Sequence, residues 1–419
     1  MTPTARIRLR RACTAVTAAG VLIAPVAAGP AYGTSAPART AAAAPAVPDA
    51  RSAPSPDAGR DFPELTPAVA AKLDAAIRDT LREAKVPGVI VGLWAPGKGS
   101  YVRTFGVADK ESGAPMRTDF YTRIGSQTKT FTVTALLRLV DQGKAGLDDP
   151  IGTYVSGVPN GDRITLRELA GMRSGLFNYS EDEEFGKALT TGGTRPFTPR
   201  QLLDYSFRHP VQFEPNAKFQ YSNTNLILLG LVIEKVTGQP LQRVISEQVI
   251  EPAGLHHTLF PTNADFPEPH AQGYTDQSAS GDIVDSTDWN PSWAWAAGAM
   301  ISTMEDLRSW AKTLATGTLL KPATQAERLK TTSAGIPGAG YGLGIFDVQG
   351  WIGHNGSLPG YESLGVYLPE ERATLVVILN TDVLHDGQEP STLFGEAITG
   401  IVTPDHVYPG HEPTAPRHG

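Results

Sequence analysis

A serine and a lysine stand three residues apart in the segment Arg-Ile-Gly-Ser126-Gln-Thr-Lys129-Thr. If this segment begins a helix, the two side chains share one face, one turn apart. A serine hydroxyl is a weak nucleophile until a neighbour takes its proton, and a buried lysine can do so because burial lowers its pKa. The Ser126 amide would lie at a helix N-terminus, where free N–H groups favour an oxyanion. The pair therefore predicts nucleophilic catalysis through an acyl-enzyme.

The same spacing also arises by chance, as an N-terminal capping serine followed by a surface lysine. Ser309-Trp-Ala-Lys312 has this spacing too. No suitable partner residues follow that second pair in order, so we assign it no chemistry.

A tyrosine and an asparagine form a second group, Tyr221-Ser-Asn223, just before a predicted helix at 226–238. A phenol ordinarily has a pKa near ~10. Beside Lys129 we expect Tyr221 to ionise more easily and to pass a proton to the leaving group. The Asn223 amide is suited to hold a substrate carbonyl and Lys129 together. Taken alone, the segment is equally typical of a polar loop.

The third group, Gly353-His354-Asn355-Gly356-Ser357, falls on a predicted strand. Glycine in a strand lets a substrate backbone approach closely. We expect the Ser357 N–H to complete an oxyanion hole, and His354, Asn355 and Gly356 to contact substrate. Taken alone, this segment is typical of a strand end with a surface histidine.

In this order and spacing, the three groups resemble the S-x-x-K, Y-x-N and H-x-G motifs of the penicillin-recognising serine hydrolases. The similarity is greatest to the D-alanyl-D-alanine carboxypeptidase and class C β-lactamase branch. It covers roughly residues 65–400 and extends to supporting stretches at 147–151, 164–169, 174–176, 297–299 and 341–344. The resemblance implies the family's fold, an acyl-enzyme route and no metal or cofactor. With Ser126 as the nucleophile, we expect Lys129 to be the general base for acylation and Tyr221 the acid that protonates the leaving group, although the two roles can be exchanged because coupled groups titrate as a set.

Three positions depart from the family pattern. Asn216 stands where the family usually has glycine, and Met172-Arg173 replace the common His-Thr. We expect both to affect structure. Asn355 fills the middle of H-x-G, where Thr or Ser is more usual, and we expect it to affect recognition of the leaving group.

Three other classes fit less well. A lipase-like hydrolase would need the motif G-x-S-x-G. No serine in this sequence has glycine both two residues before it and two residues after it. A metal site at His256-His257 lacks an acidic partner motif, and adjacent side chains point apart. A noncatalytic binding module of the same fold would be expected to have lost Ser126, Lys129 or Tyr221, and all three are present.

The elements expected to position these groups form an α+β fold. Strands predicted at 89–96 and 100–109 precede a mostly helical region, and strands return at 342–348, 350–356, 362–369 and 373–382. Helices are predicted at 65–84, 131–143 and 392–402. This order predicts one antiparallel sheet flanked by helices, with a mostly helical lobe inserted and a ligand cleft between the two.

The chain ends predict export. Residues 1–33 combine a basic start, an apolar run and small residues, as in a cleaved signal peptide. Residues 34–61 form an Ala/Pro-rich leader without enough large apolar residues to pack. The hydrolase domain is predicted at 62–404 and a polar tail at 405–419. The product is expected to be extracellular and monomeric, without a stable membrane anchor.

The net charge and the cysteine content each exclude one kind of interaction. The formal net charge of −7 argues against a nucleic-acid partner. The single cysteine, Cys13, falls inside the predicted signal, so the mature protein is expected to hold no disulfide or thiolate site.

The substrate class is the least determined property. Peptides, esters and β-lactams all suit this fold. We expect a D-alanyl-D-alanine carboxypeptidase or D-stereospecific peptidase first, with carboxylesterase or β-lactamase as alternatives. Phe346 offers no charge to grip a free carboxylate, and Trp293 and Trp295 would add apolar or stacking surface. Esters and internal or amidated D-peptides therefore suit the cleft better than free carboxylates.

Overall fold

The computed structural model describes residues 62–191 and 193–408. The predicted signal peptide, the leader and most of the predicted tail lie outside these residues. Among the helices within these two ranges, none is both long and apolar enough to cross a membrane.

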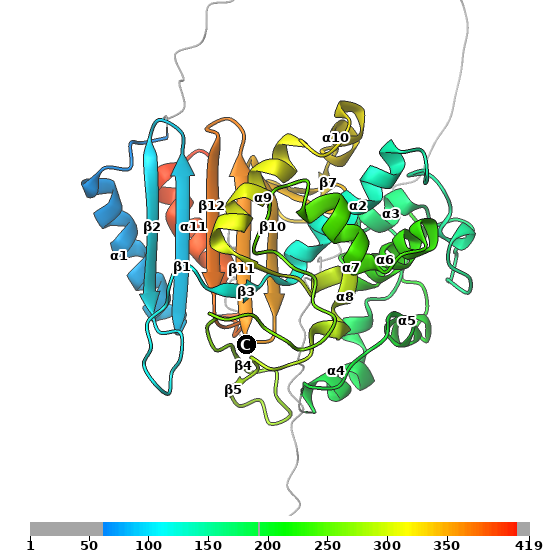
Figure 1. Ribbon diagram of the computed structural model, residues 1–419, viewed down its shortest axis with the longest axis horizontal. Helices are drawn as coiled ribbons and strands as arrows, with labels where there is room; N and C mark the ends of the chain where they lie inside the picture. Colours follow the sequence, from blue (N-terminus) through cyan, green and yellow to red (C-terminus); the bar gives the residue numbers. More distant parts are fainter. Residues whose placement is uncertain (1–61, 192, 409–419) are drawn as a thin grey trace, which may run out of the picture.

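One antiparallel sheet organises the molecule (Figure 1). Every neighbouring pair of its strands runs antiparallel. Its strands, in spatial order, are β2 (Gly99–Gly106), β1 (Gly88–Ala95), β12 (Ala373–Leu379), β11 (Tyr361–Leu368), β10 (Trp351–Leu358), β9 (Phe346–Val348), β8 (Ala339–Tyr341) and β7 (Thr332–Ser333). N- and C-terminal segments therefore complete one sheet, as predicted.

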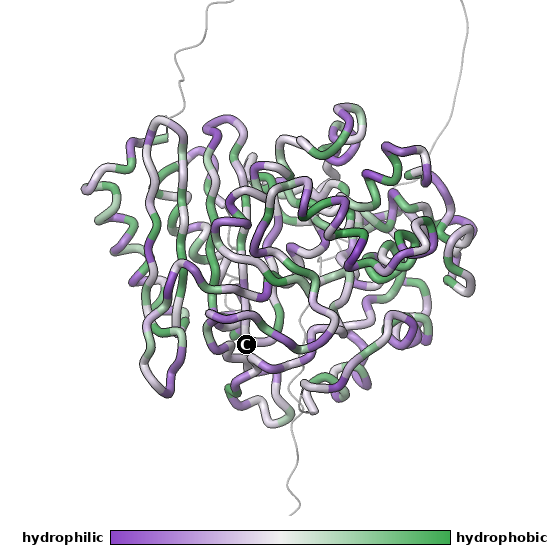
Figure 2. Tube along the Cα trace, viewed as in Figure 1, coloured by the Kyte–Doolittle hydropathy of each residue, from purple (hydrophilic) through white to green (hydrophobic). Residues whose placement is uncertain are grey.

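The central strands are covered on both faces. Every residue of β1, β11 and β12 is buried. This explains the nearly continuous apolar sequences of β1 and β12 (Figure 2), whereas β11 also carries the buried polar residues Glu362 and Ser363. Two helices, α1 (Pro67–Glu83) and α11 (Pro390–Val402), pack together behind the sheet, and α9 (Met304–Thr316) crosses its front (Figure 1).

A mostly helical lobe is inserted between β2 and β7. At its centre lie α2 (Thr128–Asp141) and α6 (Asn223–Thr237), which pack against each other. The remaining elements are α3 (Leu166–Ala170), α4 (Glu183–Thr190), α5 (Pro199–Phe207), α7 (Leu241–Ile245), α8 (Trp295–Gly298), α10 (Pro322–Arg328) and the short pairs β3 (Tyr121–Arg123) with β6 (Ile301–Thr303) and β4 (Tyr274–Thr275) with β5 (Val284–Asp285). The predicted α+β fold class is confirmed.

The prediction of a single strand over 342–348 is wrong. The chain turns between β8 and β9, where the Gly342 N–H donates to the carbonyl of Ile345. Gly344 adopts a φ of +70°, and a Cβ there would lie 2.7 Å from a Val133 methyl group. Glycine is therefore required at this tight turn against α2.

Two carboxyl groups, the completely buried Glu362 and the partly buried Glu389, lie near each other behind β10. Glu362 of β11 is completely buried; one oxygen accepts the Ser391 N–H at 2.7 Å, and the other has no hydrogen-bond partner among the described residues. Burial, and secondly the nearby Glu389 carboxyl, raise the pKa of Glu362 well above its usual range. Burial also raises the pKa of Glu389. The fold therefore favours neutral acids at this place.

We predict that Glu362→Gln weakens the pH dependence of stability. A carboxyl whose pKa is raised by folding contributes stability that is lost as pH rises from the unfolded to the folded pKa. Glutamine resembles the neutral acid and does not titrate. Urea unfolding at pH 5, 6.5 and 8 should show a smaller loss of stability in the variant. The difference should be about 1.4 kcal/mol for every pH unit that separates the unfolded-state pKa of Glu362 from its folded-state pKa.

The matched control is Glu83→Gln, at an exposed position near the end of α1. This variant should keep the wild-type pH dependence. An equal loss of stability with pH in Glu362→Gln and wild type would contradict the assignment.

Candidate active site

Ser126 and Lys129 meet where the sheet and the helical lobe join. Ser126 lies in a short 3-10 turn, Gly125–Gln127, directly before α2, and is partly exposed. Lys129 Nζ lies 2.7 Å from Ser126 Oγ and donates to the Ala297 carbonyl at 2.8 Å. A nucleophile and a base are thus within direct proton-transfer distance.

The environment of Lys129 favours a neutral amine. The side chain is completely buried, and among the described residues no carboxylate forms an ion pair with it. Burial lowers the pKa of Lys129 well below its usual range. A neutral amine can accept the Ser126 proton, which an ammonium group cannot.

Tyr221 completes a triangle with this pair. It lies two residues before α6, and Lys129 Nζ is 4.8 Å from its ring centre. Burial raises the pKa of Tyr221, partly offset by a hydrogen bond with Ser126. The expectation that Lys129 makes Tyr221 easier to ionise is therefore wrong: burial is the largest influence on the pKa of Tyr221, and Lys129 is not among the groups that lower it. The phenol keeps its proton and is better suited to act as an acid.

Two glycines bring β10 against the Ser126 turn. A Cβ at Gly356 would lie 1.9 Å from the Ile124 carbonyl oxygen and 2.9 Å from Ser126 N. Gly125 has a φ of +53°, and a Cβ there would lie 2.6 Å from Ser357 N. The backbone nitrogens of Ser126 and Ser357 therefore lie close together beside the nucleophile. Two such N–H groups can stabilise an oxyanion.

His354 is a neutral group in the wall of the site. It is buried, with Nδ1 2.5 Å from the Asn355 carbonyl oxygen and Nε2 3.4 Å from the Tyr341 hydroxyl. Burial first, and then the charge of Lys129, lower the pKa of His354 to about 3. Its ring packs 4.9 Å from that of Phe346. An imidazole in this state cannot offer a positive charge to a substrate carboxylate.

Asn355 does not face Ser126. Successive residues of a strand point to opposite faces, and Gly356 faces the Ser126 turn. The Asn355 amide accordingly donates to Oε2 of Glu389 at 2.5 Å, and Glu389 is the residue directly before α11. The expectation of substrate contact is corrected: Asn355 links β10 to the acid pair behind it.

Asn223 is close to the site but is bound elsewhere. Its amide donates to Ser180 Oγ at 3.1 Å, and its backbone N–H donates to Asn178 Oδ1 at 3.0 Å. Among the hydrogen bonds of the described residues, none joins Asn223 to Lys129. Lys129 instead uses the Ala297 carbonyl, a backbone acceptor whose only sequence signal was the 297–299 match.

The two tryptophans occupy different surroundings. Trp293 is half-buried; its ring lies 5.9 Å from Phe185, and its carbonyl accepts the Tyr179 hydroxyl at 2.6 Å. The Trp295 ring packs on α6, where a Cβ at Gly230 would approach it to 2.6 Å. Trp295 therefore serves packing, whereas Trp293 belongs to an aromatic cluster of the helical lobe.

The structural departures from the family pattern contact one another. Asn216 has a φ of +67°, a conformation that asparagine tolerates better than most residues. Arg173 donates to its side-chain oxygen at 2.7 Å and to its carbonyl at 2.5 Å. Met172 is buried, and its sulfur accepts from the Ser222 N–H at 3.5 Å. Together they support the segment that carries Tyr221.

The second serine–lysine pair has no such setting. Ser309 and Lys312 are exposed on α9, and Ser309 Oγ donates to the Glu305 carbonyl at 3.2 Å. Among the hydrogen bonds of the described residues, none joins the Ser309 hydroxyl to an acidic or basic side chain.

Comparisons with known proteins agree with this arrangement. The family model described as Beta-lactamase matches residues 73–393. The structure is similar to that of a D-stereospecific amidohydrolase from Streptomyces sp., with a TM-score of 0.70 and 31% identity, covering 80% of this chain and 97% of that one.

Two curated relatives are similar over shorter parts of their length. Protein flp of Staphylococcus aureus (strain MRSA252) is 27% identical over 74% of this chain, and the match spans 62% of that protein. Esterase EstB of Burkholderia gladioli is 33% identical over 46% of this chain and 52% of its own. From the extent of the family match and the similarity to these proteins, we conclude that the chain belongs to the beta-lactamase family and is a serine hydrolase of that superfamily.

Proposed function

We propose that the protein is an exported D-stereospecific amidohydrolase that cleaves D-amino-acid amides and D-peptides through an acyl-enzyme on Ser126. The observation that carries this proposal is the 2.7 Å contact between a partly exposed serine hydroxyl and a buried lysine amine. The predicted signal peptide at 1–33 supports export.

The proposed reaction begins at the substrate carbonyl. Ser126 Oγ bonds to the carbonyl carbon while Lys129 takes the hydroxyl proton. The N–H groups of Ser126 and Ser357 stabilise the oxyanion. The C–N bond then breaks; the leaving nitrogen takes a proton from Tyr221, which is reprotonated by Lys129. Water hydrolyses the resulting ester and restores Ser126.

The preference for an uncharged leaving side rests on the groups around the nucleophile. His354 is neutral, and Tyr341 and Phe346 pack against it. Recognition of a free carboxylate usually needs Arg or Lys, and these three side chains supply no positive charge. Similarity to a D-stereospecific amidohydrolase over most of both chains also favours an amide substrate.

Ester hydrolysis is the second candidate. An ester with a good leaving group needs no proton on the departing oxygen, so the Ser126–Lys129 pair alone suffices. Similarity to an esterase over part of the chain also supports this activity.

We predict that Ser126→Ala abolishes covalent labelling. A fluorophosphonate or penicillin should add one adduct to the wild-type protein in intact-mass spectra, and none to the variant, because the attacking oxygen is gone. Ser309→Ala serves as the matched control and should label like the wild type. An adduct on the Ser126 variant would refute the assignment.

Tyr221→Phe should separate amide from ester cleavage. If the phenol protonates the leaving group, its loss should slow hydrolysis of a D-amino-acid amide by roughly 100-fold or more. Hydrolysis of p-nitrophenyl butyrate should fall much less, since p-nitrophenolate leaves without a proton. The measurement is kcat on both substrates at one pH.

The control for this experiment is Tyr121→Phe, which removes a hydroxyl from β3 and should leave both rates unchanged. Equal losses on amide and ester in Tyr221→Phe would contradict the role of proton donor.

Four substrates test the specificity directly: a D-Ala-D-Ala peptide, its C-terminal amide, p-nitrophenyl butyrate and nitrocefin. We expect the amidated peptide to be cleaved with a higher kcat/KM than the free acid, because none of His354, Tyr341 and Phe346 offers a positive charge to compensate the carboxylate. A strong preference for the free acid would refute this specificity. Hydrolysis of the ester alone would reject the amidohydrolase in favour of the esterase.

A further inference from the structure

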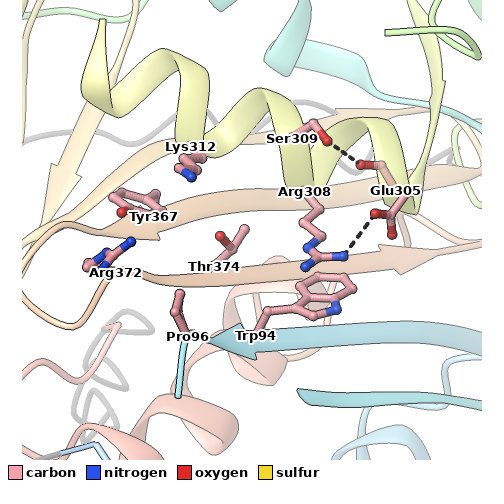
Figure 3. A pocket seen from close by; sticks show the side chains of 9 residues that line it. All are labelled: Trp94, Pro96, Glu305, Arg308, Ser309, Lys312, Tyr367, Arg372 and Thr374. Carbon is pink, nitrogen blue, oxygen red and sulfur yellow. Dashed lines mark hydrogen bonds and ion pairs between the residues drawn. The ribbon is translucent and has the colours of Figure 1, made fainter. Parts of the chain in front are cut away.

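A cavity lies outside the Ser126 site, between α9 and the front of the sheet (Figure 3). Its volume is about 360 Å³. Tyr367 of β11 lines it, four residues beyond Ser363, which pairs with Gly356 at the nucleophile. At ~3.3 Å per residue the two places are ~13 Å apart along the strand. The cavity is therefore distinct from the Ser126 site.

The floor of this cavity is a row of three residues across the sheet. Trp94 pairs with Thr374, and Thr374 pairs with Tyr367, so the three side chains share one face. Tyr367 is 4% exposed and Thr374 is 5% exposed. Among the hydrogen bonds of the described residues, none uses either hydroxyl. Neither hydroxyl is among the buried polar atoms that lack a partner, although both residues line the cavity. Both hydroxyls are therefore open to the cavity, where water or a ligand can pair with them.

The rim carries more positive than negative charge. Arg308 and Lys312 of α9 and Arg372 of the β11–β12 turn line the cavity, against one carboxylate, Glu305. Arg308 is held by Glu305 at 2.9 Å and stacks 4.6 Å above the Trp94 ring. In the part of the chain that the structure describes, no ion pair engages Lys312 or Arg372. Two cations therefore remain available in a chain whose formal net charge is −7.

We propose that this cavity binds the phosphate group of an organic phosphate. Lys312 and Arg372 supply two charges for a dianion, Arg372 as a planar fork and Lys312 as a point charge. The adjacent hydroxyls of Tyr367 and Thr374 donate to the remaining oxygens. The volume exceeds that of one phosphate, which leaves room for the group that carries it, next to Arg308 and Trp94. A small phosphate ester and a unit of a phosphodiester polymer share this chemistry.

Calorimetric titration of the protein with glycerol 3-phosphate, at low salt and pH 7.5, tests the proposal. We expect saturable binding that weakens as salt rises. Lys312→Gln and Arg372→Gln should each weaken it by roughly 10-fold, as expected for loss of a charge-assisted hydrogen bond. Tyr367→Phe, which keeps the ring, should weaken it by a smaller factor. Thermal melts establish that each variant is folded.

Matched controls make the result specific. Lys144→Gln removes the same charge from an exposed position after α2 and should bind like the wild type, as should Ser126→Ala. Glycerol should not bind. A glycerol-phosphate polymer that binds much more tightly than glycerol 3-phosphate would identify the polymer as the source of the phosphate, and equal binding would identify the small ester.

Three results would overturn the proposal. The first is the absence of saturable binding by glycerol 3-phosphate and by the polymer. The second is an equal loss of binding in Lys144→Gln and Lys312→Gln. The third is binding of citrate as tight as that of glycerol 3-phosphate, which would show no preference for phosphate.

Discussion

Much of the site follows from the burial of one amine. A charged ammonium group loses several kcal/mol of hydration when it is buried without a carboxylate. Within residues 62–191 and 193–408, the hydrogen-bond partners of Lys129 Nζ are one hydroxyl and one carbonyl oxygen. The amine is therefore driven toward its neutral form. Burial of the amine requires α2 to pass through the centre of the lobe, and it requires α8 to present the Ala297 carbonyl to Lys129. It also requires the chain before α2 to keep Ser126 at the surface of the lobe. Desolvation raises the free energy of the charged form of Lys129, and for the same reason it makes the neutral amine available as a base.

Close approach of backbones is the second requirement. The Ser126 turn belongs to the helical lobe and the Ser357 amide to the sheet, so an oxyanion site exists only where the two parts touch. Side chains at Gly125 or Gly356 would separate them, since a Cβ at either position would overlap backbone atoms of the other segment. Behind this contact, β10 is tied through Asn355 to Glu389 and paired with β11, which carries the buried Glu362. The strand is thus braced from the face opposite the nucleophile.

The sequence allowed the sheet, the inserted lobe and the meeting of Ser126, Lys129 and Tyr221 to be predicted, because strand patterns and motif spacing are local signals. Other features of the site depend on how deeply a side chain is buried and on contacts between elements that are distant in the sequence. The raised pKa of Tyr221 reflects burial, which no local pattern reports. The Ala297 carbonyl is a backbone atom without a side-chain signature. The turn that divides 342–348 depends on the approach of Val133 from another element. The position of Asn355, by contrast, could have been predicted from the sequence. Successive strand residues point to opposite faces, so if Gly356 faces the nucleophile, the Asn355 side chain must point away from it.

The pKa values of Lys129 and Tyr221 move in opposite directions for one reason. Burial favours the neutral form of both groups, so it lowers the lysine pKa and raises the tyrosine pKa. Before substrate binds, the site then holds an uncharged base and an uncharged acid within one contact of the same hydroxyl. In the proposed reaction, transfer of the serine proton to Lys129 would place the new ammonium beside the oxyanion and the phenol. Each step therefore creates a charge next to its opposite, and the low-polarity surroundings strengthen that attraction. A neutral His354 in the wall fits the same scheme, because a fixed positive charge there would oppose the protonation of Lys129 on which the transfer depends.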